Sequence, residues 1–290
     1  MPSIDLITNV VVAGVLTGLV YGLMALGLSV IFGVVRVVNF AHGEMMTIAM
    51  YCAVALFAAF KLDPFLSVLP VAAVFFGVGY AMQSGLINPF ITRPEHSQFM
   101  LLVAVAIIMV NVLLMIFGPS ALNVQVDYQL ESFELGPILF DKARVFAAGM
   151  ALVTSGALFA FFKFTNTGKA IRACADNNRG AKVVGLDVKH LYALTFGLGS
   201  ACVAVAGCMM ILLVDVTPTL GPGYTLLAFM IVIIGGLGSM PGAIFGGILI
   251  GMSEALAGLF FAPSAKSMFC FALLILVLLF RPQGLLGRKA

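Results

Sequence analysis

The chain alternates between long apolar runs and short polar or glycine-rich and proline-rich interruptions. An α-helix needs about 20 predominantly apolar residues to cross the hydrocarbon core of a bilayer. The runs predict nine membrane-spanning helices, at residues 8–34, 45–60, 65–87, 97–117, 145–162, 191–214, 225–237, 242–260 and 267–280. The first run is long enough to tilt or break, and only an uncharged stretch separates the seventh from the eighth, so about eight or ten spans remain alternatives.

Composition restricts the fold class further. Of 290 residues, 62% are hydrophobic and only 9% are charged, which excludes a soluble globular domain. The predicted fold is all-α: one polytopic transmembrane helical bundle that takes up residues 1–290, with little chain outside the bilayer. A net charge of +3 is too small to indicate a nucleic-acid surface. The five cysteines form no Cys-x-x-Cys pair and four of them lie within apolar runs, so we expect neither a disulfide framework nor a zinc site. No cofactor is predicted.

Basic residues are concentrated in alternate loops. Cytoplasmic loops of membrane proteins retain Lys and Arg. Residues 163–190 contain the largest group, which predicts a cytoplasmic loop, with the N-terminus outside and the C-terminus inside: Lys163, Lys169, Arg172, Arg179, Lys182 and Lys189. Alternation leaves four basic residues outside: Lys61, Lys142, Arg144 and Lys266. The acidic loop at residues 118–144 is then a small extracytoplasmic cap.

The 163–190 loop has a helical pattern. Small apolar residues alternate with charged ones, which predicts one or two short amphipathic helices that break near residues 177–180. Small side chains on such a helix permit the close approach of a partner surface. The alternative is a basic interfacial helix bound to anionic lipid.

Four tracts carry a family resemblance. Residues 168–176 (GKAIRACAD), followed by Ala181 and Gly185-Leu186-Asp187, resemble the cytoplasmic coupling loop of permease subunits in branched-chain amino acid ABC importers. Residues 38–44 (VNFAHGE), 235–243 (GGLGSMPGA) and 280–287 (FRPQGLLG) resemble the same family in order and spacing. The resemblance covers essentially the whole chain and is greater to the shorter of the two permease types.

The resemblance implies a transporter that depends on partners. The only Gly-Lys pair, Gly168-Lys169, lacks the rest of a P-loop, so the chain should not bind ATP in that way. The family's partners are a second homologous permease, two cytoplasmic ATP-binding subunits and a periplasmic solute-binding protein. The chain would be a multi-pass permease, not an enzyme, in a bacterial inner membrane, and would carry branched-chain or other amino acids or amides. The resemblance assigns ATPase coupling to Gly168, Ala170, Arg172, Ala173, Asp176, Ala181 and Gly185.

Polar residues inside apolar segments are candidates for a translocation pathway. Asn39, His42 and Glu44 are expected at an inner membrane border, either as a structural corner, with His42 and Glu44 paired, or along the pathway. Glu254 falls near the middle of the 242–260 segment, where a carboxylate must be paired, protonated or in contact with water. A pathway or inter-subunit role and a structural role both remain open for Glu254.

Glycines at four-residue spacing predict close helix packing. One such face contains Gly14, Gly18 and Gly22, and a later one contains Gly238, Gly242 and Gly246. A second cluster predicts either packing or a flexible break beside the pathway: Gly235, Gly236, Gly238, Pro241 and Gly242.

Two further patterns bear on the class of transporter. A weak repeat, with a shift of 203 residues that aligns Tyr21 with Tyr224, would fit a transporter of two related halves. A self-contained secondary transporter is the alternative function. Its ion coupling would rest on Glu254 alone, and the 163–190 loop would have no purpose in it. An intramembrane enzyme is not supported, because no catalytic motif occurs.

Overall fold

The computed structural model describes the chain except for residues 1–2, 92, 137, 262–265 and 288–290. Each of the nine predicted spans corresponds to a helix, which confirms a polytopic helical bundle. These helices are α1 Ile4–Val35, α2 His42–Phe60, α3 Pro64–Ala81, α4 Glu95–Phe117, α5 Lys142–Phe164, α8 Val188–Met210, α9 Gly221–Gly235, α10 Met240–Phe260 and α11 Lys266–Phe280. Beyond α3 the chain continues through a π-helix, Met82–Ile87, and a 3-10 turn, Asn88–Phe90.

Helix length separates the nine into two groups. Seven helical segments in the described part of the chain are long and apolar enough to cross a membrane. The helices α9 and α11 have 15 residues each. At 1.5 Å per residue such a helix is about 22 Å long, which is less than the roughly 30 Å hydrocarbon core. The two are therefore too short to span a bilayer of that thickness when taken alone.

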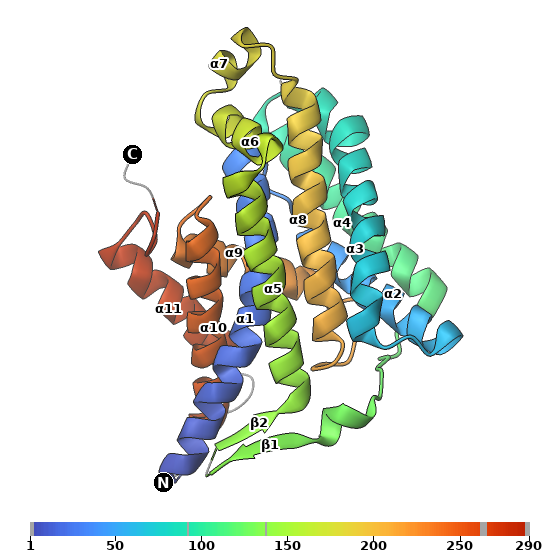
Figure 1. The fold of residues 1–290 in the computed structure, drawn as a ribbon, viewed down its shortest axis with the longest axis vertical. Helices are drawn as coiled ribbons and strands as arrows, with labels where there is room; N and C mark the ends of the chain where they lie inside the picture. The colour runs from blue at the N-terminus through green and yellow to red at the C-terminus, as the bar shows by residue number, and fades with distance from the viewer. Residues whose placement is uncertain (1–2, 92, 137, 262–265, 288–290) are drawn as a thin grey trace.

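The helix α1 is the axis of the bundle. It is an unbroken helix of 32 residues, so the expected alternative of a break does not occur. Figure 1 shows it running from the N-terminus at the bottom of the view into the bundle, between α10 and α5. The most apolar stretches of α1 and α8 are 83% buried inside the protein, whereas that of α4 is 17% buried. The outer helices thus present apolar side chains outward, as expected for contact with lipid or another subunit.

Glycine contacts hold α1 against α10. A Cβ atom on Gly18 would lie 2.7 Å from the carbonyl oxygen of Gly247, and one on Gly14 would lie 2.8 Å from that of Gly251. The predicted face of α1 is therefore a packing face. On α10 the matching residues are Gly247 and Gly251, whereas Gly246 faces α9, where its Cβ would lie 2.6 Å from the carbonyl oxygen of Ile231.

A small β-hairpin closes one end of the bundle. Strand β1 Ser132–Leu135 pairs antiparallel with β2 Ile138–Asp141, a feature that the all-α prediction lacks. The hairpin is attached to α1 by the backbone N–H of Leu139, which donates to Oδ1 of Asn9 at 2.9 Å. The hairpin and the N-terminus lie together at the bottom of Figure 1, and this end is called the hairpin end below.

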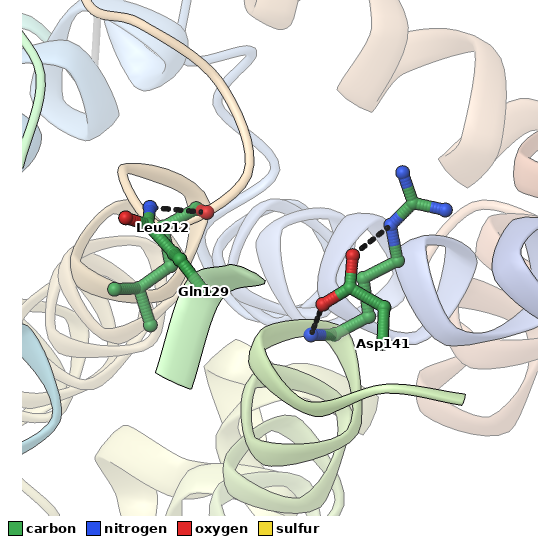
Figure 2. A network of polar contacts seen from close by, with 4 residues as sticks. Gln129, Asp141 and Leu212 are labelled. Atoms are coloured by element: carbon green, nitrogen blue, oxygen red, sulfur yellow. Dashed lines mark hydrogen bonds and ion pairs between the residues drawn. The ribbon is translucent and has the colours of Figure 1, made fainter. Parts of the chain in front are cut away.

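Hydrogen bonds join the connection that precedes the hairpin to the segment after α8. Nε2 of Gln129 donates to the carbonyl oxygen of Leu212 at 2.8 Å (Figure 2). Leu122 and Val216 exchange two backbone hydrogen bonds in an isolated bridge. These contacts join the connection to the segment that follows α8.

Two short helices form the opposite end of the protein. They are α6 Asn166–Asp176 and α7 Asn178–Val183, with the break at Asn177, inside the predicted interval. Thr165 and Asn177 cap them, because their side-chain oxygens accept hydrogen bonds from the N–H groups of Gly168 and Gly180 at 2.9 Å each. Figure 1 shows both helices at the top, and we call this the α6–α7 end.

Candidate translocation and coupling sites

The chain turns back into the bundle after α1. Arg36 ends that helix in the left-handed conformation (φ 57°), and α2 begins at His42. Nε2 of His42 donates to the carbonyl oxygen of Met24 at 2.9 Å. Met24 precedes the end of α1 by 11 residues, or about 16 Å of helix. The start of α2 therefore lies inside the bundle, with Asn39, His42 and Glu44 all buried, so these residues are not at the outer end of α1.

The N-terminus of α9 meets that of α2 inside the protein. The Gly43 N–H donates to Oγ1 of Thr225 at 2.9 Å, and the Thr225 hydroxyl donates to Oε2 of Glu44 at 2.9 Å. Glu44 is 3% exposed and lies in the first turn of α2, where the helix dipole stabilises a negative charge. His42 and Glu44 contact different partners, so the expected His42–Glu44 pair does not form.

Two glycines allow this approach. A Cβ atom on Gly221 would lie 2.9 Å from Cα of Glu44, and one on Gly43 would collide with the carbonyl oxygen of Gly221 and the amide nitrogen of Thr225. The junction of Gly43, Glu44, Gly221 and Thr225, called the α2–α9 junction below, is closely packed. Its residues line none of the cavities described next.

Three cavities have lining side chains in common. The loop cavity, about 760 Å³, lies between residues 123–130 and 211–215. The middle cavity, about 470 Å³, shares Arg144, Leu213 and Val214 with it. The α9 cavity, about 290 Å³, shares Tyr21, Glu254 and Lys266 with the middle cavity. The shared side chains make the three cavities a row.

Glu254 occupies the junction of the middle and α9 cavities. It is half-buried on α10, and Tyr21 of α1 lines the same two cavities. The rings of Tyr21 and Tyr224, the pair that the weak repeat aligns, lie 6.4 Å apart beside it. Contact with a cavity is one of the conditions that a carboxylate within a membrane segment requires.

The second glycine cluster forms a tight turn between α9 and α10. Gly236 (φ 103°) and Gly238 (φ 77°) have backbone conformations that favour glycine, and Pro241 lies in the first turn of α10. The C-terminal segment covers the turn, since the N–H groups of Leu285 and Leu286 donate to the carbonyl oxygens of Ile234 and Gly235 at 2.8 and 3.0 Å. This geometry favours the packing interpretation for Gly235, Gly236, Gly238, Pro241 and Gly242, which line none of the cavities above.

The predicted coupling residues divide between the two faces of the α6–α7 segment. Gly168 and Ala181 are buried, and Ala170 is half-buried. Their small size is explained by packing within the chain, because a Cβ on Gly168 would lie 2.6 Å from Cα of Phe162. The remaining four are exposed: Arg172, Ala173, Asp176 and Gly185.

Sequence reasoning missed the tip of this segment. Val183 and Val184 are 87% and 75% exposed where α7 ends. The sequence contains a signal for it, because two adjacent valines in a basic loop expose apolar surface unless a partner covers them. Cys174 on the inner face is buried, and burial raises the pKa of its thiol, so a reactive thiolate is not expected there.

Comparisons with known proteins identify a family. Residues 10–278 match the model of a family described as "Branched-chain amino acid transport system / permease component". The permease protein LivH of a high-affinity branched-chain amino acid transport system in Salmonella typhimurium is 32% identical over 95% of this chain and 94% of its own length. The corresponding protein BraD of Pseudomonas aeruginosa is 30% identical over 99% and 98%. A probable LivH of Methanocaldococcus jannaschii is 28% identical over 91% and 88%.

The fold and these matches define a class, the polytopic membrane permeases. Within this class the chain belongs to the family of branched-chain amino acid transport system permease components. The family resemblance of the four sequence tracts is thereby confirmed.

Proposed function

We propose that this chain is the membrane permease subunit of an ATP-driven importer for branched-chain or related amino acids in a bacterial inner membrane. Family membership and the names of its relatives support the substrate class. The exposed α6–α7 segment carries the proposal for the energy source. It presents charged and apolar side chains at the end of the protein opposite the hairpin.

The distribution of basic residues supports an orientation. Arg36, Arg93 and Arg281 follow helices that end toward the α6–α7 end, which itself carries six basic residues between 163 and 190. Lys61, Lys142, Arg144 and Lys266 belong to the opposite, hairpin end. Because cytoplasmic segments retain Lys and Arg, residues 163–190 form the cytoplasmic coupling loop in this proposal. Residues 118–144 are then extracytoplasmic.

Each partner has a place in this orientation. Two ATP-binding subunits serve the complex, one docking on the α6–α7 segment, whose exposed residues include Arg172, Ala173 and Asp176. A second, homologous permease covers part of the apolar outer surface. A periplasmic solute-binding protein delivers the amino acid at the hairpin end, next to the loop cavity. Differential binding of the ATPases to inward-facing and outward-facing states then drives alternating access.

The function is tested by leucine uptake into proteoliposomes that contain the complex purified from its native membrane. With solute-binding protein outside and ATP enclosed, leucine should accumulate, and a non-hydrolysable ATP analogue should stop the accumulation. An ion gradient without ATP should have no effect. Accumulation driven by the ion gradient would instead support the secondary transporter.

A further inference from the structure

The middle cavity combines charges of both signs with an apolar wall. Glu254 reaches it from α10, Arg144 from the first turn of α5, and Lys266 from the first turn of α11. Side chains of α1 and of the segment after α8, among them Val10 and Val214, supply apolar surface. The volume of about 470 Å³ is within the range of small-molecule sites.

The charges that meet at this cavity do not neutralise one another in direct pairs. Among the described residues the ion pairs are Lys142 with Glu131 and Arg144 with Asp141. The second is loose, with Nε of Arg144 at 3.6 Å from Oδ2 of Asp141, and both of its side chains are more than a third exposed. Glu254 takes part in neither pair, and Tyr21, which lines the same two cavities, carries no charge. Purely structural charges in a membrane segment would be expected to pair.

A solute with both charges would satisfy these groups together. An ammonium group alone would leave Arg144 and Lys266 without a counter-charge in the cavity, and a simple anion would be repelled by Glu254. A neutral amide or urea could hydrogen-bond but would compensate no charge. A zwitterion with an aliphatic side chain matches the acid, the two bases and the apolar wall.

We propose that the middle cavity binds the zwitterionic head group of the transported amino acid. The Glu254 carboxylate holds the α-ammonium group, and Arg144 and Lys266 hold the α-carboxylate, while the aliphatic side chain lies against the apolar wall. This inference rests on the proposed import of amino acids and names the site that the solute occupies within the permease.

The middle cavity lies between the loop cavity and the α9 cavity, which is the position expected of a site that a transported solute passes through. Arg144 lines both the loop cavity and the middle cavity, so it reaches a solute that approaches from the hairpin end. Glu254 and Lys266 line both the middle cavity and the α9 cavity. A solute that moves inward leaves Arg144 while it keeps contact with Glu254 and Lys266.

The proposal is tested with Glu254→Gln in the complete complex, in proteoliposomes with solute-binding protein outside and ATP inside. Glutamine keeps the size and removes the charge. We expect leucine uptake to fall at least about tenfold, because a charge-assisted hydrogen bond to the ammonium group is lost. ATP hydrolysis stimulated by the solute-binding protein should persist. The matched control is Asp5→Asn, an exposed carboxylate in the first turn of α1, which should transport like the wild type.

A second pair of variants tests the carboxylate partner. Lys266→Gln should raise the KM for uptake, measured by varying the concentration of solute-binding protein that is already loaded with leucine. The control is Lys61→Gln, which changes an exposed lysine at the end of α2 and should leave this KM unchanged. Unchanged uptake and KM in both Glu254→Gln and Lys266→Gln would overturn the proposed head-group site. Uptake by the wild-type complex would still support the proposed importer function. Should Glu254→Gln fail to fold, the KM of Lys266→Gln decides. If the wild-type complex takes up no leucine, it is the proposed function that fails.

Discussion

Replacement of Val183 and Val184 by aspartate is expected to abolish ATP-driven uptake while the permease itself stays folded. Both side chains are more than two thirds exposed, so the change removes little contact within the chain. In the proposed complex they are buried against an ATP-binding subunit. Burying one valine contributes about 1.5–3 kcal/mol, and an unpaired carboxylate in the same place costs several kcal/mol more. Uptake and stimulated ATP hydrolysis should both fall by more than about tenfold.

The matched control is the double variant Val183→Thr and Val184→Thr. Threonine keeps the branched shape without a charge, so this variant should retain most of the coupling. Thermal unfolding of the isolated permease in detergent should be the same for both variants and the wild type. Normal coupling in the aspartate variant would remove the valine tip from the docking surface. Arg172→Ala, at another exposed position of the segment, should reduce coupling less severely.

Gly43→Ala is expected to lower the yield and thermal stability of the folded permease sharply. An added methyl group would collide with the Gly221 carbonyl oxygen and the Thr225 amide nitrogen, both backbone atoms, so relief requires α2 and α9 to move apart. Overpacking of a well-packed interior typically costs about 1–3 kcal/mol, and more where backbone must shift. The separation would also break the hydrogen bond from the Gly43 N–H to Thr225.

Gly149→Ala is the matched control for this change. Gly149 lies in the third turn of α5, and a Cβ added there meets no atom within 4 Å. Its replacement should leave the melting temperature unchanged or slightly raised, because alanine has the higher helix propensity. Equal melting temperatures for Gly43→Ala and the wild type would mean that the α2–α9 junction is looser than described.

The helices, including those of the α6–α7 segment, could be predicted from local signals. Runs of apolar residues located all nine large helices to within a few residues. The break between α6 and α7 follows from Asn177, whose side chain caps the second helix. Such signals depend on neighbouring residues in the chain, which is why sequence alone reveals them.

The depth of the α2–α9 junction could not be predicted in the same way. Residues 37–41 are mostly apolar, and an apolar connection reads the same at a membrane border and inside a bundle. Glu44 is hydrogen-bonded by Thr225, which is 181 residues away in the sequence. No local pattern identifies so distant a partner.

Two further misses have similar causes. On α10 the pairs Gly242 with Gly246 and Gly247 with Gly251 have the same four-residue spacing, so spacing does not decide which pair meets α1. The hairpin strands have only four residues each, too few for a clear alternation of apolar and polar positions. In both cases the local sequence is compatible with more than one structure, and contacts with distant parts of the chain determine which one forms.

The composition of the native complex tests the central claim most directly. The chain, tagged and extracted from its native membrane in mild detergent, should be weighed intact by native mass spectrometry and its partners identified. The account predicts one further permease and two ATP-binding subunits for each copy of this chain. A lone or self-associated chain that still moves leucine across liposomes without ATP would contradict it.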